Sequence, residues 1–306
     1  MSQSHYTRLA GVLDTLPDGE LVSVLTAATG RPGHGARVLF RAYMACFVLN
    51  TTTISAGLRL IEDDPTLTEI VGGAPTKFAL SRFIRKLKDH TDLLDACMAS
   101  LVGDAHVLLP DLGEHTAVDS TDISAWSSWR RSDPDAKSSV KTGTDGHPHW
   151  WYGYKCHLTC DTRYELPLLA YVTTANVSDV RQLPPSIEGV RAMGVNPTHV
   201  LADAGYDSMA NIRYVESIDA APIIKRKKLK NRPLPEPTKA WWAVYRQRSG
   251  IEHLFGRAKE FRRLNRLTLK GLARATVHCL CSILSLLAGA VAVLLLDRPD
   301  LIRRVV

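Results

Sequence analysis

The strongest constraint on the fold is a long uncharged segment near the C-terminus. From Ala275 to Leu296 no residue is charged, and the segment includes the run ILSLLAGAVAVLLL. A helix of about 20 apolar residues can span a bilayer, so the segment predicts either a membrane anchor or a helix buried under a sheet. We favour the buried helix, because His278, two cysteines and two serines interrupt the apolar run. In addition, nothing else in the chain is typical of a membrane protein.

The first third of the chain has helical periodicity. The segments ARVLFRAYMACFVLN, ISAGLRLIEDD and KFALSRFIRKLKDHTDLLDACMASLV place apolar residues at helical spacing, and GRPGHG and GGAP interrupt the pattern. We therefore predict a helical N-terminal domain over residues 1–110. Four cations give the third segment a basic side: Arg82, Arg85, Lys86 and Lys88. This side is either a solvated helix face or the DNA-contacting helix of a helix-turn-helix-like unit.

From residue 115 the pattern changes to strands. HTAVDST, YGYKCHLTCD and ELPLLAYVTTA predict three strands, with a turn over residues 161–164 between the second and the third. THVLAD and APIIKRK predict two more strands, and residues 184–193 and SMANIRYVES predict helices between them. Three successive strands followed by alternating strands and helices imply an α/β fold, with a mixed sheet flanked by helices.

Carboxylates follow two of these strands. Asp119 in AVDST and Asp203 in LADAGYDS each come after an apolar run, and ligands of open α/β sheets gather at the carboxyl ends of strands. If the strands are neighbours, the two like charges need a cation between them. Glu252 would supply a third carboxylate, and such an oxygen-only set suits Mg²⁺ or Mn²⁺. Taken singly, each aspartate could instead be a turn or cap residue, and Glu252 could pair with a neighbouring arginine.

The segment YRQRSGIEHLFGRAKEF, residues 245–261, predicts one amphipathic helix with a narrow polar ridge. At about 100° per residue, four polar side chains project within about 60° of one another. They are Tyr245, Arg248, Glu252 and Lys259. The apolar residues fall on the opposite side of the helix. One carboxylate and two cations therefore project from the same narrow polar side.

These four residues match the pattern Y-x2-R-x3-E-x6-K, and the sequence resembles the DDE transposases of bacterial insertion sequences that carry this signature. VDST around Asp119 and DAGYDS from Asp203 resemble the first and second aspartate motifs of that family, and GYKCHLTCD resembles the strand and turn between them. The resemblance is strongest over residues 115–270. It implies an RNase H-like catalytic core, here expected over residues 111–306. In this core Asp119, Asp203 and Glu252 would hold two Mg²⁺ ions, with Mn²⁺ as a substitute.

The resemblance also implies double-stranded DNA as partner, both as transposon ends and as target. Water would first free a 3′ hydroxyl, which would then attack the target DNA. Arg248 and Lys259 would contact phosphates beside the metal ions, and Tyr245 would orient the terminal nucleotide. Four further cations are expected to contact the DNA backbone: Arg263, Arg266, Lys227 and Lys228. For the basic stretch around Lys227, a solvated loop is the alternative.

Composition agrees with a nucleic-acid partner, because the formal net charge is +7. The six cysteines form no CxxC pair and the N-terminus has no signal-peptide pattern, so we expect reduced thiols in a cytoplasmic, nucleoid-associated protein without a membrane partner. A homodimer is expected in the DNA complex. Two other functions stay open: a metal-dependent nuclease of the same fold, and a domesticated DNA-binding protein without catalysis.

The number of residues between the acids limits the size of any inserted domain. Residues 204–251, between the second aspartate and Glu252, are too few for the large β-rich insertion of some relatives, so the helical N-terminal part must recognise the transposon end. Trp241 and Trp242 either stack on a flipped base or pack at a helix start. A zinc site is a further, weaker alternative, because its candidate ligands lack a standard spacing. Those candidates are His147, His149, His157, Cys156 and Cys160.

Overall fold

A computed structural model of the chain describes residues 3–26, 33–127, 132–142, 146–227 and 236–304. The elements before residue 110 are helices, in agreement with the periodicity of this part of the sequence. They are α1 (Gln3–Thr15), α2 (Gly19–Leu25), α3 (Ala36–Val48), α4 (Ile54–Asp63), α5 (Pro65–Val71), α6 (Lys77–Leu87) and α7 (Thr91–Leu108).

A six-stranded mixed sheet forms the centre of the molecule. Its strands are β1 (His115–Ser124), β2 (Lys137–Thr142), β3 (Pro148–Asp161), β4 (Leu166–Thr174), β5 (His199–Ala202) and β6 (Ala221–Ile224). β3 is antiparallel to β1, β2 and β4, whereas β1, β5 and β6 run parallel to one another. The predicted mixed sheet is confirmed. The sequence does not predict β2, because its KSSVKT has one apolar residue, Val140, which is itself exposed.

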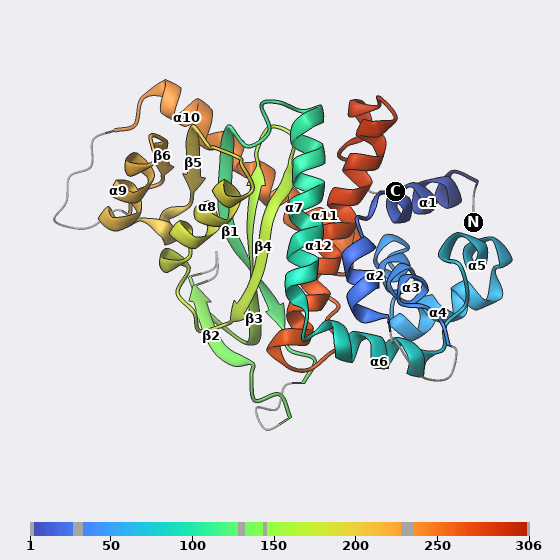
Figure 1. The fold of residues 1–306 in the computed structure, drawn as a ribbon. Coiled ribbons are helices and arrows are strands. Elements are labelled where there is room, and N and C mark those ends of the chain that lie inside the picture. The colour runs from blue at the N-terminus through green and yellow to red at the C-terminus, as the bar shows by residue number, and fades with distance from the viewer. Residues whose placement is uncertain (1–2, 27–32, 128–131, 143–145, 228–235, 305–306) are drawn as a thin grey trace.

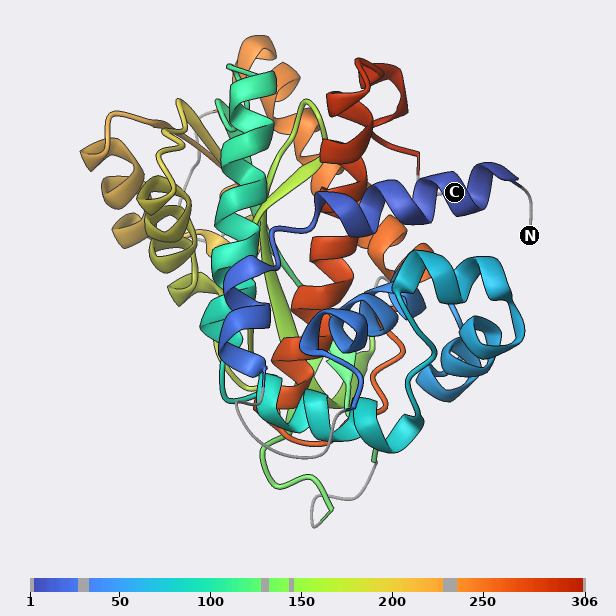
Figure 2. The ribbon, with the colours of Figure 1, turned by 45° about the vertical axis from the view of Figure 1, so that its right-hand side comes forward.

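Helices cover both faces of the sheet (Figure 1). The later helices are α8 (Leu183–Ala192), α9 (Met209–Ser217), α10 (Lys239–Tyr245), α11 (Ser249–Phe261) and α12 (Leu272–Leu295). α8 and α9 lie on one face, over a small apolar cluster that includes Val118 and Val200. α7 and α12 lie on the other face, and α11 packs against β1 and β3. The helices α1, α3 and α6 pack against α12 (Figure 2).

The uncharged C-terminal segment is the buried helix α12. It is long and apolar enough to cross a membrane, but 83% of its most apolar stretch is buried inside the protein. β4 and α7 cover it on the side of the sheet, and α1 covers it on the opposite side. Two of its polar side chains have partners in the interior: the His278 ring nitrogen Nε2 lies 2.8 Å from the Arg263 carbonyl, and the Ser285 hydroxyl donates to the Ser282 carbonyl at 2.7 Å. The prediction of a helix buried under a sheet is therefore confirmed.

One large apolar core joins the N-terminal helices to the sheet. It extends from Leu9 in α1 through α3 and α7 to residues of β3, β4 and α12. α7 packs directly on β4, although it precedes the expected domain boundary at residue 110. The two predicted domains therefore share one hydrophobic core. A boundary at this residue would separate two functional regions, not two independently folding units.

The closest approach between β1 and β3 occurs at Gly153. A Cβ atom on this residue would overlap the Ile123 carbonyl oxygen and would lie 2.7 Å from the Ala125 nitrogen. We expect Gly153→Ala to lower the free energy of unfolding by about 3 kcal/mol, because the strand backbones must separate. Urea unfolding followed by tryptophan fluorescence measures this change.

Gly103→Ala is the matched control, because Gly103 lies inside α7 and a Cβ there would meet nothing within 4 Å. It should raise the free energy of unfolding by about 0.5–1 kcal/mol, since alanine has the higher helix propensity. Unfolding curves for Gly153→Ala that coincide with those of the wild type would show that the close approach is not maintained.

Candidate active site

The two aspartates lie side by side because two parallel strands separate where they occur. β1 and β5 are paired from His115 and His199 as far as Val118 and Ala202. Asp119 and Asp203 are the next residues on these neighbouring strands, and Asp203 is near enough for its charge to raise the pKa of Asp119. The expectation that Asp119 ends its strand is wrong, because β1 continues to Ser124 on its pairing with β3. The strand that ends at this point is β5.

Asp119 lies in an unfavourable environment for a carboxylate. Its side chain is only 22% exposed. Burial, together with the negative charge of Asp203, raises the pKa of Asp119 to about 6. Glu252 also raises this pKa, whereas the backbone N–H of Ser120 and the guanidinium of Arg248 lower it. Asp203 is half-buried, and its Oδ1 accepts a hydrogen bond from Gly205 N at 2.7 Å.

Arg248 connects the third acid to this pair. Its Nη1 lies 3.2 Å from Asp119 Oδ2, and its Nη2 donates to Glu252 Oε1 one helical turn later. Burial alone would lower the pKa of Arg248, but Asp119 and Glu252 together raise it. The alternative that Glu252 pairs with a neighbouring arginine is thus observed, and the same arginine also brings Glu252 towards β1.

The segment that carries Arg248 is held against the start of β1. Gln247 Oε1 lies 2.7 Å from His115 Nδ1. Gly250 lets α11 approach the turn after β3, since a Cβ atom there would lie 3.0 Å from the Thr162 carbonyl oxygen. Arg248 therefore reaches Asp119 from a backbone that is packed on the sheet.

The predicted single helix over residues 245–261 is correct in part, because the backbone stays helical across the junction but one 3₁₀ turn interrupts the α-helix. α10 ends at Tyr245, the 3₁₀ turn η3 (Arg246–Arg248) follows, and α11 begins at Ser249. A 3₁₀ turn has about 3.0 residues per turn rather than 3.6, so a uniform 100° rotation does not hold across it. Tyr245 nevertheless stays beside Arg248, with 5.9 Å between the guanidinium carbon and the ring centroid. Trp241 stacks on Tyr245 at 4.9 Å, and the ring of Trp242 meets both edge-on.

The predicted DNA-contacting cations have different surroundings. Lys259 is half-buried on α11, and burial lowers its pKa. Lys227 is exposed just after β6, near the Asp203 turn, since its backbone N–H donates to Asp207 Oδ2 at 2.8 Å. Lys228 lies outside the described residues.

The prediction for Arg263 is wrong. Its side chain is 0% exposed, close to the Thr51 hydroxyl and the Phe47 ring, so it cannot reach DNA. Arg266 is half-buried, and its Nη1 donates to the Asn50 carbonyl at 3.1 Å.

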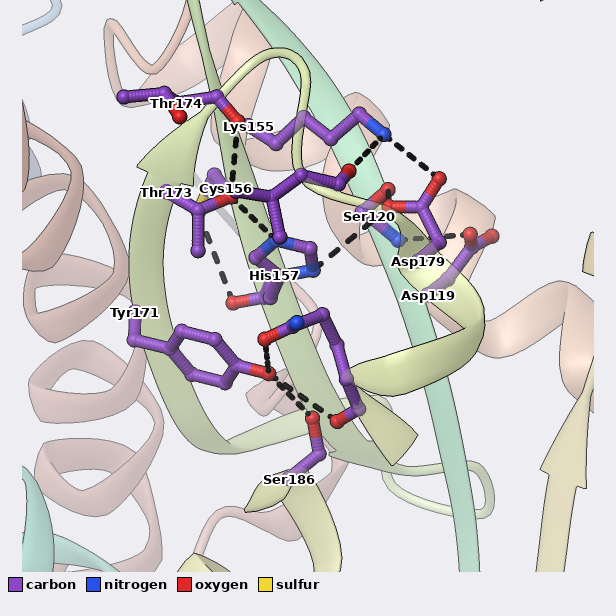
Figure 3. A network of polar contacts seen from close by, with 12 residues as sticks. Asp119, Ser120, Lys155, Cys156, His157, Tyr171, Thr173, Thr174, Asp179 and Ser186 are labelled. Carbon is purple, nitrogen blue, oxygen red and sulfur yellow. Dashed lines mark hydrogen bonds and ion pairs between the residues drawn. The ribbon is translucent and has the colours of Figure 1, made fainter. Parts of the chain in front are cut away.

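A polar network that the sequence motifs did not predict lies beside Asp119 (Figure 3). It contains Ser120, Asp179, Lys155 and His157, from β1, from the turn after β4 and from β3. A signal for it exists in YKCHLT, where polar side chains alternate with apolar ones on a strand that is otherwise buried. The 3₁₀ turn η1 (Asp179–Arg181) supplies the additional carboxylate.

The three acids offer oxygen ligands of the kind that hard divalent cations prefer. Asp203 and Glu252 are near enough to Asp119 for their charges to raise its pKa, and Arg248 is the cation that bridges Asp119 and Glu252. Oxygen-only donors of this kind suit Mg²⁺ or Mn²⁺. Among the described residues, however, no three acids, histidines or cysteines are already close enough together to hold an ion. Zinc is disfavoured because Cys156 points into the large core, whereas its strand neighbour His157 faces Asp179 on the other side of β3.

Comparisons with known proteins show what this chain is similar to. Residues 110–288 match the family model described as a transposase DDE domain. A 161-residue segment is 32% identical to the transposase for insertion sequence element IS1106 of Neisseria meningitidis serogroup B, covering 52% of each chain. A 121-residue segment is 32% identical to a Burkholderia cepacia protein named for the transposase of insertion sequence element IS402, covering 35% of this chain and 57% of the relative. The matches thus span about half the length of these curated relatives.

The environment of Asp119 predicts that the metal-free protein gains stability when this charge is removed. A pKa of about 6 in the folded protein, against about 3.9 in the unfolded chain, means that ionised Asp119 opposes folding. Each unit of pKa corresponds to about 1.4 kcal/mol, so Asp119→Asn should raise the free energy of unfolding by up to about 3 kcal/mol. The gain should be nearly complete above pH 6 and should vanish below about pH 4, where the carboxyl is protonated in both the folded and the unfolded state.

Thermal unfolding in EDTA at pH 8 and at pH 4 tests this expectation. Asp104→Asn is the control, because Asp104 is exposed on α7, a helix that contributes no residue to the site. A lower melting temperature for Asp119→Asn at pH 8 would contradict the prediction, and would mean that the contact with Arg248 outweighs the repulsion.

Proposed function

Because this chain belongs to the transposase DDE domain family, we propose that it is an insertion-sequence transposase that cleaves the ends of its element and joins the freed 3′ hydroxyl to target DNA. The observation that carries the proposal is the register of β1 with β5, which makes Asp119 and Asp203 neighbours, together with the link from Arg248 to Glu252.

We assign Asp119, Asp203 and Glu252 as the ligands of two Mg²⁺ ions, with Mn²⁺ as a substitute. When bound, such ions would activate the attacking oxygen and stabilise the leaving 3′ oxygen. The protein contributes the placement of its acids. Asp119 Oδ1 is held by the Ser120 N–H, so that Oδ2 faces Arg248 and Glu252. Glu252 is 56% exposed and therefore accessible from solvent.

The sheet supports an RNase H-like core. The strand order β4-β3-β1-β5-β6 has three antiparallel strands followed by two strands parallel to β1, and helices cover both faces. We assign this core to residues 111–306, and the recognition of transposon ends to the helical part within residues 1–110.

Within the N-terminal part, α6 is the proposed DNA-contacting helix. Its sequence KFALSRFIRKL has no acidic residue, and the exposed cations are Lys77, Arg82, Arg85 and Lys86. Phe78 is 77% exposed in the first turn. Recognition helices present their N-terminal residues to base edges, where an apolar side chain can contact a thymine methyl group.

DNA phosphates near the acids would be contacted by Arg248 and Lys259, with further backbone contacts from Arg266 and Lys227. Tyr245 would orient the terminal nucleotide, since its ring lies beside Arg248. A homodimer on DNA and a cytoplasmic, nucleoid-associated location are part of the same proposal. A nuclease of the same fold would cleave without joining, so the products on a labelled end fragment distinguish the two.

Loss of any one of the three acids should abolish strand cleavage. Asp119→Asn, Asp203→Asn and Glu252→Gln should each lower the cleavage rate by more than about 100-fold in Mg²⁺, because each removes a metal ligand. Binding of end DNA should stay within about threefold of the wild type, because phosphate contacts supply most of the affinity. Gel-shift titration and sequencing-gel analysis of the products measure both quantities.

The exposed Glu260→Gln on the same helix is the control for Glu252→Gln and should cleave normally. Wild-type cleavage by any one of the three variants would remove that residue from the site. A protein that binds DNA but never cleaves would favour the domesticated DNA-binding alternative.

Lys259 should contribute one phosphate contact. We expect Lys259→Ala to lower the slope of log K against log salt by about 0.9, which corresponds to one counterion. Cleavage should fall further than binding, since a phosphate contact beside the acids also positions the scissile bond. Fluorescence anisotropy at several salt concentrations measures the slope, with the neighbouring Glu260→Ala as control. An unchanged slope and unchanged cleavage would exclude Lys259 from the interface.

A further inference from the structure

The backbone beside Asp119 is anchored by a side chain from a different part of the sheet. The N–H of Ser120 donates to Asp119 Oδ1 at 2.8 Å, and the hydroxyl of the same serine donates to Asp179 Oδ1 at 2.9 Å. The pairing of β1 with β5 has already ended at Val118. At Ser120, β1 is still paired with β3, and the serine hydroxyl adds a contact with the turn after β4.

Asp179 is itself fixed by an ion pair. Lys155 Nζ donates to Asp179 Oδ2 at 2.8 Å and to the Val177 carbonyl at 2.9 Å (Figure 3). The side chain of Lys155 is only 11% exposed in the middle of β3, so its charge is compensated within the protein. His157 Nδ1 lies 4.0 Å from Asp179 Oδ1, and its Nε2 lies 2.8 Å from the Thr173 hydroxyl.

The same turn is also tied to the other aspartate. The buried Asn211 amide donates at 2.8 Å to the Val180 carbonyl and at 2.8 Å to the Tyr206 carbonyl. Val180 lies in η1, next to Asp179. Tyr206 ends η2 (Ala204–Tyr206), the turn that Asp203 begins. One short segment after β4 therefore contacts the chain next to Asp119 and the chain next to Asp203.

We propose that Asp179 is a positioning residue of the active site, which acts through Ser120 to orient the carboxylate of Asp119, while Asn211 holds the Asp203 turn to the same segment. The inference rests on the proposed function, because it concerns the spacing of two proposed metal ligands. The network leaves Asp119 Oδ2 directed to the side of Arg248. Residues that orient metal ligands typically affect metal affinity by 10–100-fold.

A purely structural role for Asp179, as the counter-ion of Lys155, is the competing explanation. Ser120→Ala distinguishes the two explanations. It removes the hydrogen bond through which Asp179 would act on Asp119, and it leaves the ion pair of Asp179 with Lys155 intact. We expect this variant to bind Mn²⁺ at least about 10-fold more weakly than the wild type, with little change in melting temperature. Binding of Mn²⁺ alone to the full chain is measured by electron paramagnetic resonance of the free ion.

Ser186→Ala is the matched control. The Ser186 hydroxyl lies 3.0 Å from the Tyr171 hydroxyl at the far end of the same region, and it makes no contact on the path to Asp119. This variant should bind Mn²⁺ as the wild type does. Wild-type affinity for Mn²⁺ in Ser120→Ala would overturn the inference.

Asp179→Asn should also weaken Mn²⁺ binding, but it leaves the charge of Lys155 uncompensated and can unfold the protein. The double variant Lys155→Met with Asp179→Asn removes both charges. If Asp179 positions Asp119, the folded double variant keeps the weak Mn²⁺ binding. Restored affinity would show a counter-ion role only and would overturn the inference.

Asp119→Asn distinguishes this inference from the proposed function. Loss of Mn²⁺ binding in Asp119→Asn, together with normal binding in Ser120→Ala, overturns the role of Asp179 and leaves the metal site standing. Mn²⁺ binding that does not depend on Asp119 overturns the metal site, and the inference fails with it.

Discussion

The burial of Asp119 beside a second carboxylate, where β1 and β5 separate, is the constraint on which the site depends. Asp119 is buried enough, and close enough to Asp203, for its pKa to rise to about 6. Arg248 compensates part of this charge by bridging Asp119 and Glu252. A site that concentrates negative charge in this way opposes folding, and it is retained in proteins when a cation or a substrate makes use of it. The destabilisation and the proposed catalysis have the same origin.

The cost of these acids is offset elsewhere, chiefly by the burial of α12. This helix packs on β4 and α7 on one side and on α1 on the other, so a single apolar core holds the N-terminal helices to the sheet. Each Å² of buried apolar surface contributes roughly 25 cal/mol to the free energy of folding. A helix that is buried over most of its length therefore makes a large contribution. The segment that resembles a membrane anchor by composition, α12, is thus a central helix of the hydrophobic core.

The sequence predicted what local pattern and motif spacing determine. The pattern of YGYKCHLTCD indicated β3, and the apolar runs before Asp119 and Asp203 indicated two strands, which the structure shows to be parallel neighbours. It could not predict the 3₁₀ turn at residues 246–248, because a uniform helical count assumes unbroken geometry. Nor could it find Asp179, whose role depends on the long-range contact with Ser120. Contacts between distant segments are not encoded in any local period.

The arginines after α11 form a basic run in the sequence, but in the folded protein they contact other parts of the chain. Arg262 Nη1 lies 3.4 Å from the Val48 carbonyl, Arg263 Nη1 lies 3.4 Å from the Thr51 hydroxyl, and Arg266 Nη1 donates to the Asn50 carbonyl. In return, the Asn50 amide donates to the Glu260 carbonyl at 2.7 Å. These three arginines contact the end of α3 and the loop after it, and the burial of Arg262 and Arg263 keeps those two side chains away from phosphates. Because they follow the helix that carries Glu252, they connect the proposed end-binding helices to the proposed active site through a shared, partly buried contact.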